Sequence, residues 1–343
     1  KDDATQAVVL IKNGVLIGEQ YAEGFDKDSY GTSWSMAKSF YAALIGISID
    51  RGEINDLDDK VNLYLDYFND ERSKITIRDL LNMSSGLEYP ENQHENMFFL
   101  NDHLEYSKSI GVEKEANTVF EYNNVNSMLL GDILEKATGK KADLLLNERI
   151  LDPIGVKNST VWTDNAGNPL AYCCIDMSAR DYSRFGLLFS RNGNWNGNQL
   201  ISKDFVDETF TEYWDVTPQW WTNAKRGYTL HWWVSKNDEE GSIFNASGKF
   251  GQYIFVDREN DIIFTRITKY HPTPGSIQDW GRLSRVEVNN IGRWLKVTRF
   301  LEKVGILDAD DLKTPNTRKE GESKEFYEIY GEVIDSISDL SRN

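Results

Sequence analysis

The chain has 343 residues, of which 40% are hydrophobic, so it is long enough to bury a sizeable core as one large domain or two closely packed lobes. It carries 38 basic against 55 acidic residues, a formal net charge of −17. This balance, without a long run of Lys and Arg, argues against nucleic acid and anionic membranes as partners. No apolar run reaches the roughly 18 residues that a membrane-spanning helix needs.

Two apolar, β-rich runs open the chain between Ala7 and Tyr21 and meet at Asn13-Gly14, a pair that is typical of a tight hairpin turn. A long helix is predicted next, from Met36 to Ile49, with Arg51-Gly52 as its C-terminal stop. This segment is apolar around most of its circumference, so we expect the helix to be buried.

The only S-x-x-K sequence of the chain, Ser35 to Lys38, lies at the start of this helix. A serine hydroxyl needs a neighbouring base to act as a nucleophile, and the i, i+3 spacing places Lys38 on the same helix face as Ser35. Burial would lower the pKa of Lys38 and free its amine to accept a proton. The alternative is a snorkelling lysine beside a capping serine, and the tetrapeptide alone favours neither.

The pattern Y-x-N occurs twice. Tyr67-Phe68-Asn69 lies in a charged stretch, and we interpret Tyr67 as a partly exposed aromatic on a loop. Tyr122-Asn123-Asn124 follows an extended segment and precedes a helix pattern from Val125 to Lys136. A tyrosine on such a loop can point its hydroxyl into a cleft, where it would shuttle a proton between a lysine and a serine.

Strand patterns return after the helical middle of the chain, at Thr229–Val234, Ile243–Ala246, Gln252–Asp257 and Ile262–Thr268. A helix from about Gln278 to Leu295 would cover the resulting sheet. This order predicts an α+β fold, an antiparallel sheet flanked by helices with an inserted helical lobe, and an active site between sheet and lobe.

We read Phe244 to Asp257 as one glycine-containing strand on which a substrate carbonyl would dock, because Gly248 permits close backbone approach. The N–H groups of Ser35 and Lys249 would then form an oxyanion hole. The alternative for the same segment is a plain strand with a glycine bulge.

Residues 298–343 are rich in Glu, Asp, Lys and Ser. We interpret Lys313 to Ser323 as a flexible link and Lys324 to Leu340 as an amphipathic helix. Its apolar stripe would be buried on the same domain or, alternatively, in a homodimer contact.

The four histidines are scattered without metal-binding spacing, and no dinucleotide, P-loop or G-x-S-x-G motif is present. We therefore expect no metal and no cofactor. A disulfide between the neighbours Cys173 and Cys174 would be strained, so we expect two buried thiols.

Together these motifs resemble those of the β-lactamase-related serine hydrolases, the group of class C β-lactamases, D-alanyl peptidases and related esterases, and most closely the nylon-oligomer (6-aminohexanoate-dimer) hydrolases. The likeness spans about residues 6 to 297 and includes Leu80–Tyr89, Leu129–Gly139 and Met177–Gly186. It implies a β-lactamase/transpeptidase-like fold. We expect a catalytic domain over 1–297, with a sheet lobe (1–34 and 225–297) and a helical lobe (35–224), followed by an acidic, partly helical extension over 298–343.

The resemblance implies Ser35 as the nucleophile, Lys38 as its activating partner and Tyr122 as the proton shuttle. It also implies that Asn124 binds the substrate amide or carbonyl and orients Lys38, and that Tyr89 helps to hold the amide. Trp34, beside the nucleophile, is a candidate lining residue. The expected substrate-binding residues are therefore Asn124, Tyr89, Gly248, Lys249 and Trp34.

One position departs from the resemblance: Ala246 stands where class C β-lactamases and D-alanyl peptidases carry a lysine. This favours hydrolysis of a small ester or linear amide through an acyl-serine intermediate. The alternatives are a β-lactamase or D-alanyl-D-alanine carboxypeptidase, and a penicillin-binding-like sensor that is acylated without turnover. The chain begins with Lys1 rather than Met, which indicates either processing or trimming of an upstream segment. We expect a periplasmic or extracellular location, with a cytoplasmic one left open.

Overall fold

The computed structural model describes residues 5–269 apart from 91–92, 99, 212–213, 220–224 and 237–242, together with 297, 301, 304, 306 and 324–341. The helix predicted from Gln278 to Leu295 and the link predicted from Lys313 to Ser323 lie outside these residues. Within the described part of the chain, no helix combines the length and apolar character needed to cross a membrane.

The main sheet has eight strands, and each neighbouring pair is antiparallel. In spatial order the strands are β2 (Val15–Tyr21), β1 (Thr5–Lys12), β13 (Ile262–Thr268), β12 (Gln252–Asp257), β11 (Ile243–Gly248), β10 (Trp232–Lys236), β9 (Lys225–Thr229) and β8 (Trp214–Asp215). The predicted hairpin joins β1 and β2, and its turn residues Asn13 and Gly14 have φ of 52° and 72°. The predicted α+β fold with an antiparallel sheet is confirmed.

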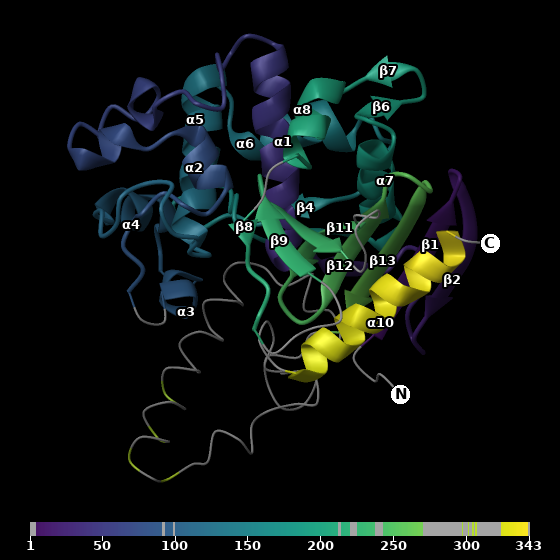
Figure 1. The fold of residues 1–343 in the computed structure, drawn as a ribbon. Helices are drawn as coiled ribbons and strands as arrows, with labels where there is room; N and C mark the ends of the chain where they lie inside the picture. Colours follow the sequence, from purple (N-terminus) through teal and green to yellow (C-terminus); the bar gives the residue numbers. More distant parts are fainter. Residues whose placement is uncertain are drawn as a thin grey trace.

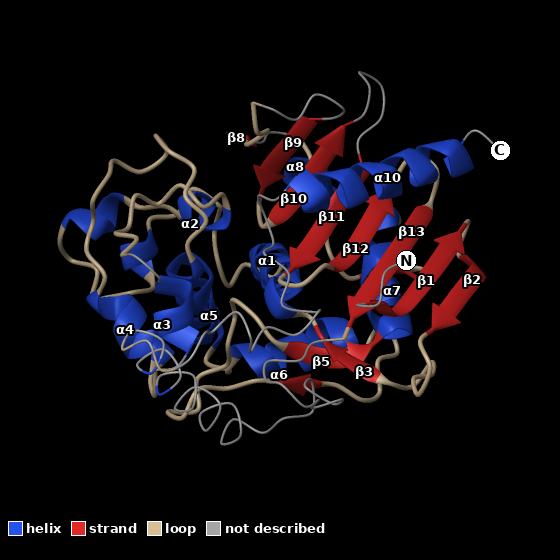
Figure 2. Ribbon diagram, turned by 90° about the horizontal axis from the view of Figure 1, so that it is seen from below, coloured by secondary structure: helices blue, strands red, loops and turns tan. Residues whose placement is uncertain are grey.

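Helices α2 to α5 gather in a lobe beside the sheet, α1 lies between this helical lobe and the sheet, and α7 and α10 lie against the sheet (Figure 2). The helices are α1 (Ala37–Asp50), α2 (Ile77–Leu81), α3 (Gln93–Phe98), α4 (His103–Ser109), α5 (Asn124–Thr138), α6 (Ala142–Leu146), α7 (Ala179–Ser190), α8 (Lys203–Thr209) and α10 (Lys324–Ser341). Two shorter sheets complete the described fold: β3 (Tyr30–Thr32), β5 (Ile175–Ser178) and β4 (Thr160–Val161), and the pair β6 (Asn194–Trp195) and β7 (Asn198–Gln199).

Helix α1 is buried on all sides, as its sequence predicts. Twelve of its fourteen residues are buried, and it packs on α5, α6 and β11. A side chain at Gly46 would meet the ring of Phe205 at 2.5 Å, so glycine is what lets α8 approach the helix. Each fully buried Leu, Ile or Phe contributes roughly 1.5–3 kcal/mol to the free energy of unfolding, so α1 is the central packing element.

Both faces of the main sheet are covered, which explains the unbroken apolar runs of its central strands. In β12, Ile254 and Val256 lie against Gly186 of α7. The alternate residues Tyr253 and Phe255 pack with α10 on the opposite face. Figure 1 shows α10, in yellow, crossing this face of the sheet.

The apolar stripe predicted on the C-terminal helix is therefore buried on the chain's own sheet. Tyr330, Ile334 and Ile337 of α10 are at most 2% exposed and form a small core cluster with residues of β11, β12 and β13. The Tyr330 hydroxyl donates to Asn245 Oδ1 at 2.6 Å. The sheet covers the described part of this stripe, as the first of the two predicted alternatives expects.

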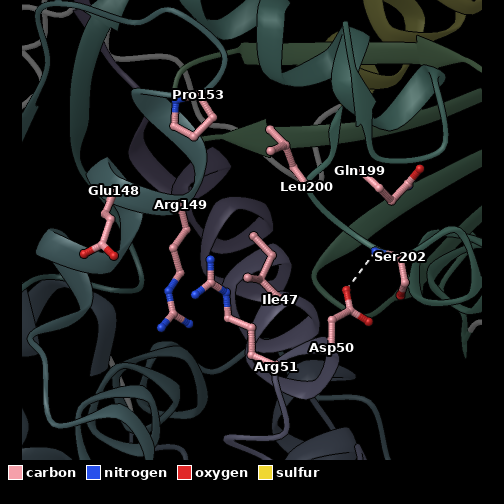
Figure 3. Close-up of a pocket in the computed structure, with 9 residues that line it drawn as sticks. All are labelled: Ile47, Asp50, Arg51, Glu148, Arg149, Pro153, Gln199, Leu200 and Ser202. Atoms are coloured by element: carbon pink, nitrogen blue, oxygen red, sulfur yellow. Dashed lines mark hydrogen bonds between the residues drawn. The ribbon is translucent and has the colours of Figure 1, made fainter. Parts of the chain in front are cut away.

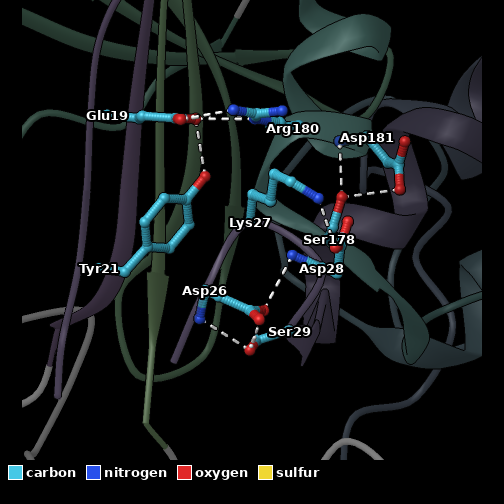
Figure 4. A network of polar contacts seen from close by, with 9 residues as sticks. All are labelled: Glu19, Tyr21, Asp26, Lys27, Asp28, Ser29, Ser178, Arg180 and Asp181. Atoms are coloured by element: carbon cyan, nitrogen blue, oxygen red, sulfur yellow. Dashed lines mark hydrogen bonds and ion pairs between the residues drawn. The ribbon is translucent and has the colours of Figure 1, made fainter. Parts of the chain in front are cut away.

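At the edge of the sheet formed by β2, polar contacts attach α7 to that strand (Figure 4). Arg180 Nε donates to Glu19 Oε2 at 2.7 Å, and Tyr21 donates to the same carboxylate. The hydroxyl of Ser178 caps the start of α7 by accepting from the N–H of Asp181 at 3.2 Å. Such exposed ion pairs contribute up to about 1 kcal/mol each, so they orient α7 more than they stabilise it.

Two strand predictions need correction. The segment Thr229–Val234 is not one strand, because the chain turns at Leu230 and His231, with φ of 37° and 65°. The N–H of Leu230 donates to Asn82 Oδ1 at 2.8 Å and that of His231 to the Leu81 carbonyl at 3.0 Å, so the helical lobe holds this turn.

The second correction concerns the docking strand read from Phe244 to Asp257. The segment is a hairpin of β11 and β12, which agrees with the separate strand patterns at Ile243–Ala246 and Gln252–Asp257. Its turn contains Phe250 and Gly251, with φ of 67° and 83°. The left-handed φ of Gly251 favours glycine there, and the Arg266 guanidinium fills the space that a side chain would take. Lys249 consequently lies in the turn and is exposed.

The cysteines are a third correction. Cys173 and Cys174 are buried, as predicted, but they form a disulfide, so the expectation of two free thiols is wrong. Cys174 has a left-handed φ of 74°, and its N–H donates to the Trp34 carbonyl at 3.3 Å. The N–H of Cys173 donates to the Leu170 carbonyl at 3.0 Å. These contacts hold a tight turn in which the two side chains meet.

A buried carboxylate lies in the small sheet next to this turn. Asp176 of β5 is 2% exposed, and its Oδ2 accepts from Trp162 Nε1 at 2.7 Å. Burial raises the pKa of Asp176 to about 7, although the hydrogen bond from Trp162 acts in the lowering direction. In the unfolded chain the same carboxyl would titrate near the ordinary value of 3.8.

We predict that Asp176 makes the protein less stable as the pH rises from about 4 to 7. Across this window the unfolded carboxyl loses its proton while the buried one keeps it, so its contribution to the free energy of unfolding falls by up to roughly 1.4 kcal/mol per pH unit. Asp176→Asn keeps an acceptor for Trp162 and removes this slope. Urea unfolding of both proteins at pH 4.5, 6 and 8 checks it; parallel pH dependences would contradict the prediction.

Candidate active site

Ser35 lies in a single 3-10 turn, Trp34–Met36, that leads from β3 into α1. The preceding residue, Trp34, has a positive φ of 45°, a conformation that non-glycine residues adopt only when the surroundings hold it. Here the Ser33 N–H donates to the Ile175 carbonyl at 2.8 Å, and the Ser33 hydroxyl accepts from the Ile175 N–H at 2.9 Å. Neighbouring β5 therefore fixes the segment that carries the serine.

The end of β11 comes unusually close to the same segment. A side chain at Gly248 would lie 2.2 Å from the Ser33 carbonyl oxygen and 3.2 Å from Trp34 Cβ, so only glycine fits there. The close approach at Gly248 is thus to the chain's own backbone before Ser35, and the docking of a substrate carbonyl on this strand stays a prediction. It leaves Ser35 half-buried beside the hairpin turn of β11 and β12.

Lys38 is 1% exposed, and its amine has three oxygen neighbours. Nζ lies 3.0 Å from Ser35 Oγ, 2.8 Å from Asn124 Oδ1 and 2.8 Å from the Tyr172 carbonyl. The amide oxygen and the carbonyl can only accept, so each takes a hydrogen from Nζ. In the neutral amine, which has two hydrogens, the lone pair is then left to face the Ser35 hydroxyl.

Burial lowers the pKa of Lys38 well below its ordinary value of 10.5. A desolvated ammonium is costly, so the neutral amine gains population inside the protein. The Lys38 amine is thus able to accept the Ser35 proton at a pH where an exposed lysine would be fully charged. The lowered pKa of Lys38 and the direction of its lone pair both favour proton transfer from Ser35 to Lys38.

Tyr122 lies beside both residues. Lys38 Nζ is 4.9 Å from the centre of its ring. Burial raises the pKa of Tyr122, whereas a hydrogen bond with Ser35 and the charge of Arg226 lower it; the net direction is upward, so the phenol stays protonated in ordinary buffers. A protonated phenol next to Ser35 can donate a proton and accept one in return.

Local sequence explains where Tyr122 and Asn124 stand. Asn123 caps α5 by accepting from the Val125 N–H at 3.0 Å, so the helix begins at Asn124 and Tyr122 precedes the cap. Gly139, with φ of 72°, ends the helix. The cap thus places the amide of Asn124 toward Lys38.

Three further predicted residues, Trp34, Tyr89 and Lys249, each lie against an aromatic ring. The Trp34 ring packs against Phe98 and Phe250, with ring centres 5.6 and 5.5 Å apart. The Tyr89 hydroxyl lies 3.4 Å from His94 Nε2, and the His94 ring meets the Tyr122 ring at 5.9 Å. Lys249 extends over the Phe250 ring, with Nζ 5.3 Å from its centre.

Three groups at the site were not predicted from sequence. The Tyr172 carbonyl is a backbone atom and has no sequence signature. The Trp233 ring stacks on the Tyr122 ring with centres 5.7 Å apart, and its one sequence signal is that it follows a second tryptophan, Trp232. His231 is buried beside Ser127, with Nε2 2.9 Å from Ser127 Oγ, and burial together with the charge of Lys38 lowers its pKa well below 6.5.

Nothing among the described residues gathers three or more His, Cys, Asp or Glu side chains in a way that would hold a metal ion. A cavity of about 400 Å³ lies elsewhere, at the C-terminal end of α1 (Figure 3). Its residues Ile47 and Asp50 are 12 to 15 positions beyond Ser35, roughly 20 Å along the helix at 1.5 Å per residue. This cavity is therefore separate from the Ser35 site.

The sequence and the fold of this chain are similar to those of known proteins. The family model described as Beta-lactamase matches residues 4–286. A curated relative, the 6-aminohexanoate-dimer hydrolase of Paenarthrobacter ureafaciens, is 22% identical over 328 residues, which cover 89% of this chain and 80% of that protein.

Solved structures show the same fold. One from Bacillus anthracis, provisionally described as a 6-aminohexanoate-dimer hydrolase, has a TM-score of 0.69 and 23% identity, with 88% of this chain and 80% of that chain covered. A family VIII carboxylesterase has a TM-score of 0.64 and 15% identity, with coverages of 85% and 92%. The predicted resemblance is confirmed, and because the family model spans most of its length, this chain belongs to the Beta-lactamase family.

Proposed function

We propose that this protein is a serine hydrolase that cleaves a carboxylic ester or a linear amide through an acyl-serine intermediate. In this proposal Ser35 is the nucleophile, Lys38 its general base and Tyr122 the proton shuttle. The observation that carries the proposal is the buried Lys38 amine, whose two acceptor partners leave its lone pair for the Ser35 hydroxyl.

Acylation would begin with attack of Ser35 Oγ on the substrate carbonyl carbon while the Oγ proton moves to Lys38 Nζ. We propose that two backbone N–H groups bind the negatively charged oxygen of the tetrahedral intermediate: that of Ser35, in the 3-10 turn before α1, and that of Lys249, in the turn between β11 and β12. Such a donor contributes roughly 3 kcal/mol to transition-state stabilisation. The bond to the alcohol or amine then breaks, and Tyr122 relays the proton from Lys38 to this leaving group.

In deacylation, water would replace Ser35 as the nucleophile and Ser35 would become the leaving group. A water molecule gives its proton through Tyr122 to Lys38, its oxygen bonds to the acyl carbon, and the Ser35–acyl bond breaks. The proton then returns to Ser35 Oγ, and the carboxylic acid leaves. Asn124, fixed by its bond to Lys38, keeps the other end of its amide for the substrate.

Two observations support an ester or linear amide as substrate. Ala246, fully buried in β11, brings no charge to the site-facing end of that strand. The curated relative is named for hydrolysis of an amide dimer, and a structural neighbour is named a carboxylesterase. We propose the same bond types for this chain.

We expect Ser35→Ala to abolish turnover of a short-chain p-nitrophenyl ester, with kcat lowered by at least roughly 1000-fold because the acyl acceptor is gone. Release of p-nitrophenol under substrate saturation measures this. Ser48→Ala is the matched control, since Ser48 is a buried serine on α1, the helix that follows Ser35, and its hydroxyl accepts from Arg149 instead. Equal turnover by wild type and Ser35→Ala would overturn the nucleophile assignment.

Two further measurements test the alternative functions, a β-lactamase and a sensor that is acylated without turnover. A chromogenic cephalosporin that is turned over rapidly would indicate a β-lactamase. Intact-mass detection of a stoichiometric, long-lived adduct on Ser35, without turnover of esters or amides, would indicate a sensor.

We expect kcat/KM of the wild type to fall toward acid pH, because protonated Lys38 has no lone pair for the Ser35 proton. The activity should rise with pH through the lowered pKa of Lys38 and then level off. Lys38→Arg retains a cation that never loses its proton, so it should be inactive across the whole range. A pH series from 5 to 10 tests both; an active Lys38→Arg enzyme with the wild-type profile would exclude Lys38 as the base.

A further inference from the structure

Tyr122 belongs to a group of stacked side chains that extends away from Ser35. Its ring stacks on Trp233, with ring centres 5.7 Å apart and an interplanar angle of 22°. The guanidinium of Arg226 lies 3.8 Å from the centre of the same Trp233 ring. Tyr228 meets both rings edge-on, at 5.9 Å from Tyr122 and 4.8 Å from Trp233. Arg226 and Tyr122, the proposed proton shuttle, thus both contact the Trp233 ring.

Arg226 is only 5% exposed, although arginine keeps its charge at every accessible pH. Charges in such surroundings are poorly screened by solvent and salt, so they act over longer distances than surface charges. The charge of Arg226 lowers the pKa of Tyr122, against the upward effect of burial. It therefore favours negative charge on the Tyr122 oxygen.

The C-terminal helix holds this cation in place. The Tyr330 ring of α10 lies 5.4 Å from the Arg226 guanidinium carbon. The Tyr330 hydroxyl bonds to Asn245 of β11 and to Ser235 of β10, the residue that pairs with Arg226 across the sheet. Tyr330 is 1% exposed, so it covers Arg226 from the outer face of the sheet.

We propose that Arg226 is a positioning residue for hydrolysis: it acts through Trp233 to orient Tyr122 and to stabilise negative charge on the Tyr122 oxygen, and Tyr330 of α10 keeps it buried. The inference rests on the proposed function, in which Tyr122 gives up a proton during each half-reaction. Lys38 contacts Tyr122 as well, and it becomes positive when it takes the Ser35 proton. The phenol would then transfer its proton between two cations, which lowers the cost of a transient phenolate.

The test compares Arg226→Met, which removes the charge but keeps an unbranched side chain, with Arg226→Lys, which keeps the charge. With a p-nitrophenyl ester, Arg226→Met should lower kcat about 10- to 100-fold and leave KM within about twofold, because substrate contacts are unchanged. Arg226→Lys should recover most of kcat. Rates are expressed per acylatable Ser35, so a loss of folded protein does not count as a loss of activity.

Arg149→Met is the matched control, because Arg149 is an equally buried arginine that pairs with Glu53 far from Ser35. It should keep the wild-type kcat per acylatable site. If wild type turns over the ester and Arg226→Met matches it, or if Arg226→Lys is as slow as Arg226→Met, the inference fails while the proposed function stands. If the wild type itself does not turn over, the proposed function fails first.

Should Arg226→Met not fold, Tyr330→Leu carries the test. It removes the aromatic cover of Arg226 at a position that makes no contact with Ser35 or Lys38. We expect kcat to fall several-fold with KM unchanged, and Tyr330→Phe, which keeps the ring, to lie closer to wild type. Equal kcat for Tyr330→Leu and wild type would overturn the role of α10.

Discussion

The amine of Lys38 is enclosed by an amide oxygen, a backbone carbonyl and aromatic rings, and this enclosure forms only where three distant segments of the chain meet. Each partner comes from a different part of the chain: Ser35 from the turn before α1, Asn124 from the start of α5, and the Tyr172 carbonyl from the segment beside the disulfide. The sheet and the helical lobe have to meet at α1 for all three to coincide.

Much of the frame was predictable because its signals are local. The hairpin at Asn13-Gly14 follows from residues that accept positive φ, and α1 follows from an apolar run with a C-terminal stop. The spacing of Ser35 and Lys38 within one turn predicts their contact, which the structure has at 3.0 Å. Asn124 was placed near Lys38 by resemblance alone, since 86 residues separate the two.

What sequence reasoning missed depends on contacts between distant segments. The turn at Leu230 and His231 has no Gly, Asn or Pro, and Asn82 and Leu81 of the helical lobe hold it. The disulfide of adjacent cysteines needs a left-handed Cys174, which only its surroundings can impose. The Tyr172 carbonyl and the stacking of Arg226 on Trp233 likewise leave no local pattern to read.

Asn124 and the Tyr172 carbonyl are far from Lys38 in the sequence, so they reach its amine only when the chain folds. In an unfolded or half-assembled chain, Lys38 is an ordinary solvated ammonium and Ser35 an ordinary alcohol, so neither reacts with esters or amides. Reactivity arises only once α1, α5 and the Tyr172 segment have closed around the amine. Nucleophile activation is therefore a late product of folding, and a newly made chain stays chemically inert until its two lobes have assembled.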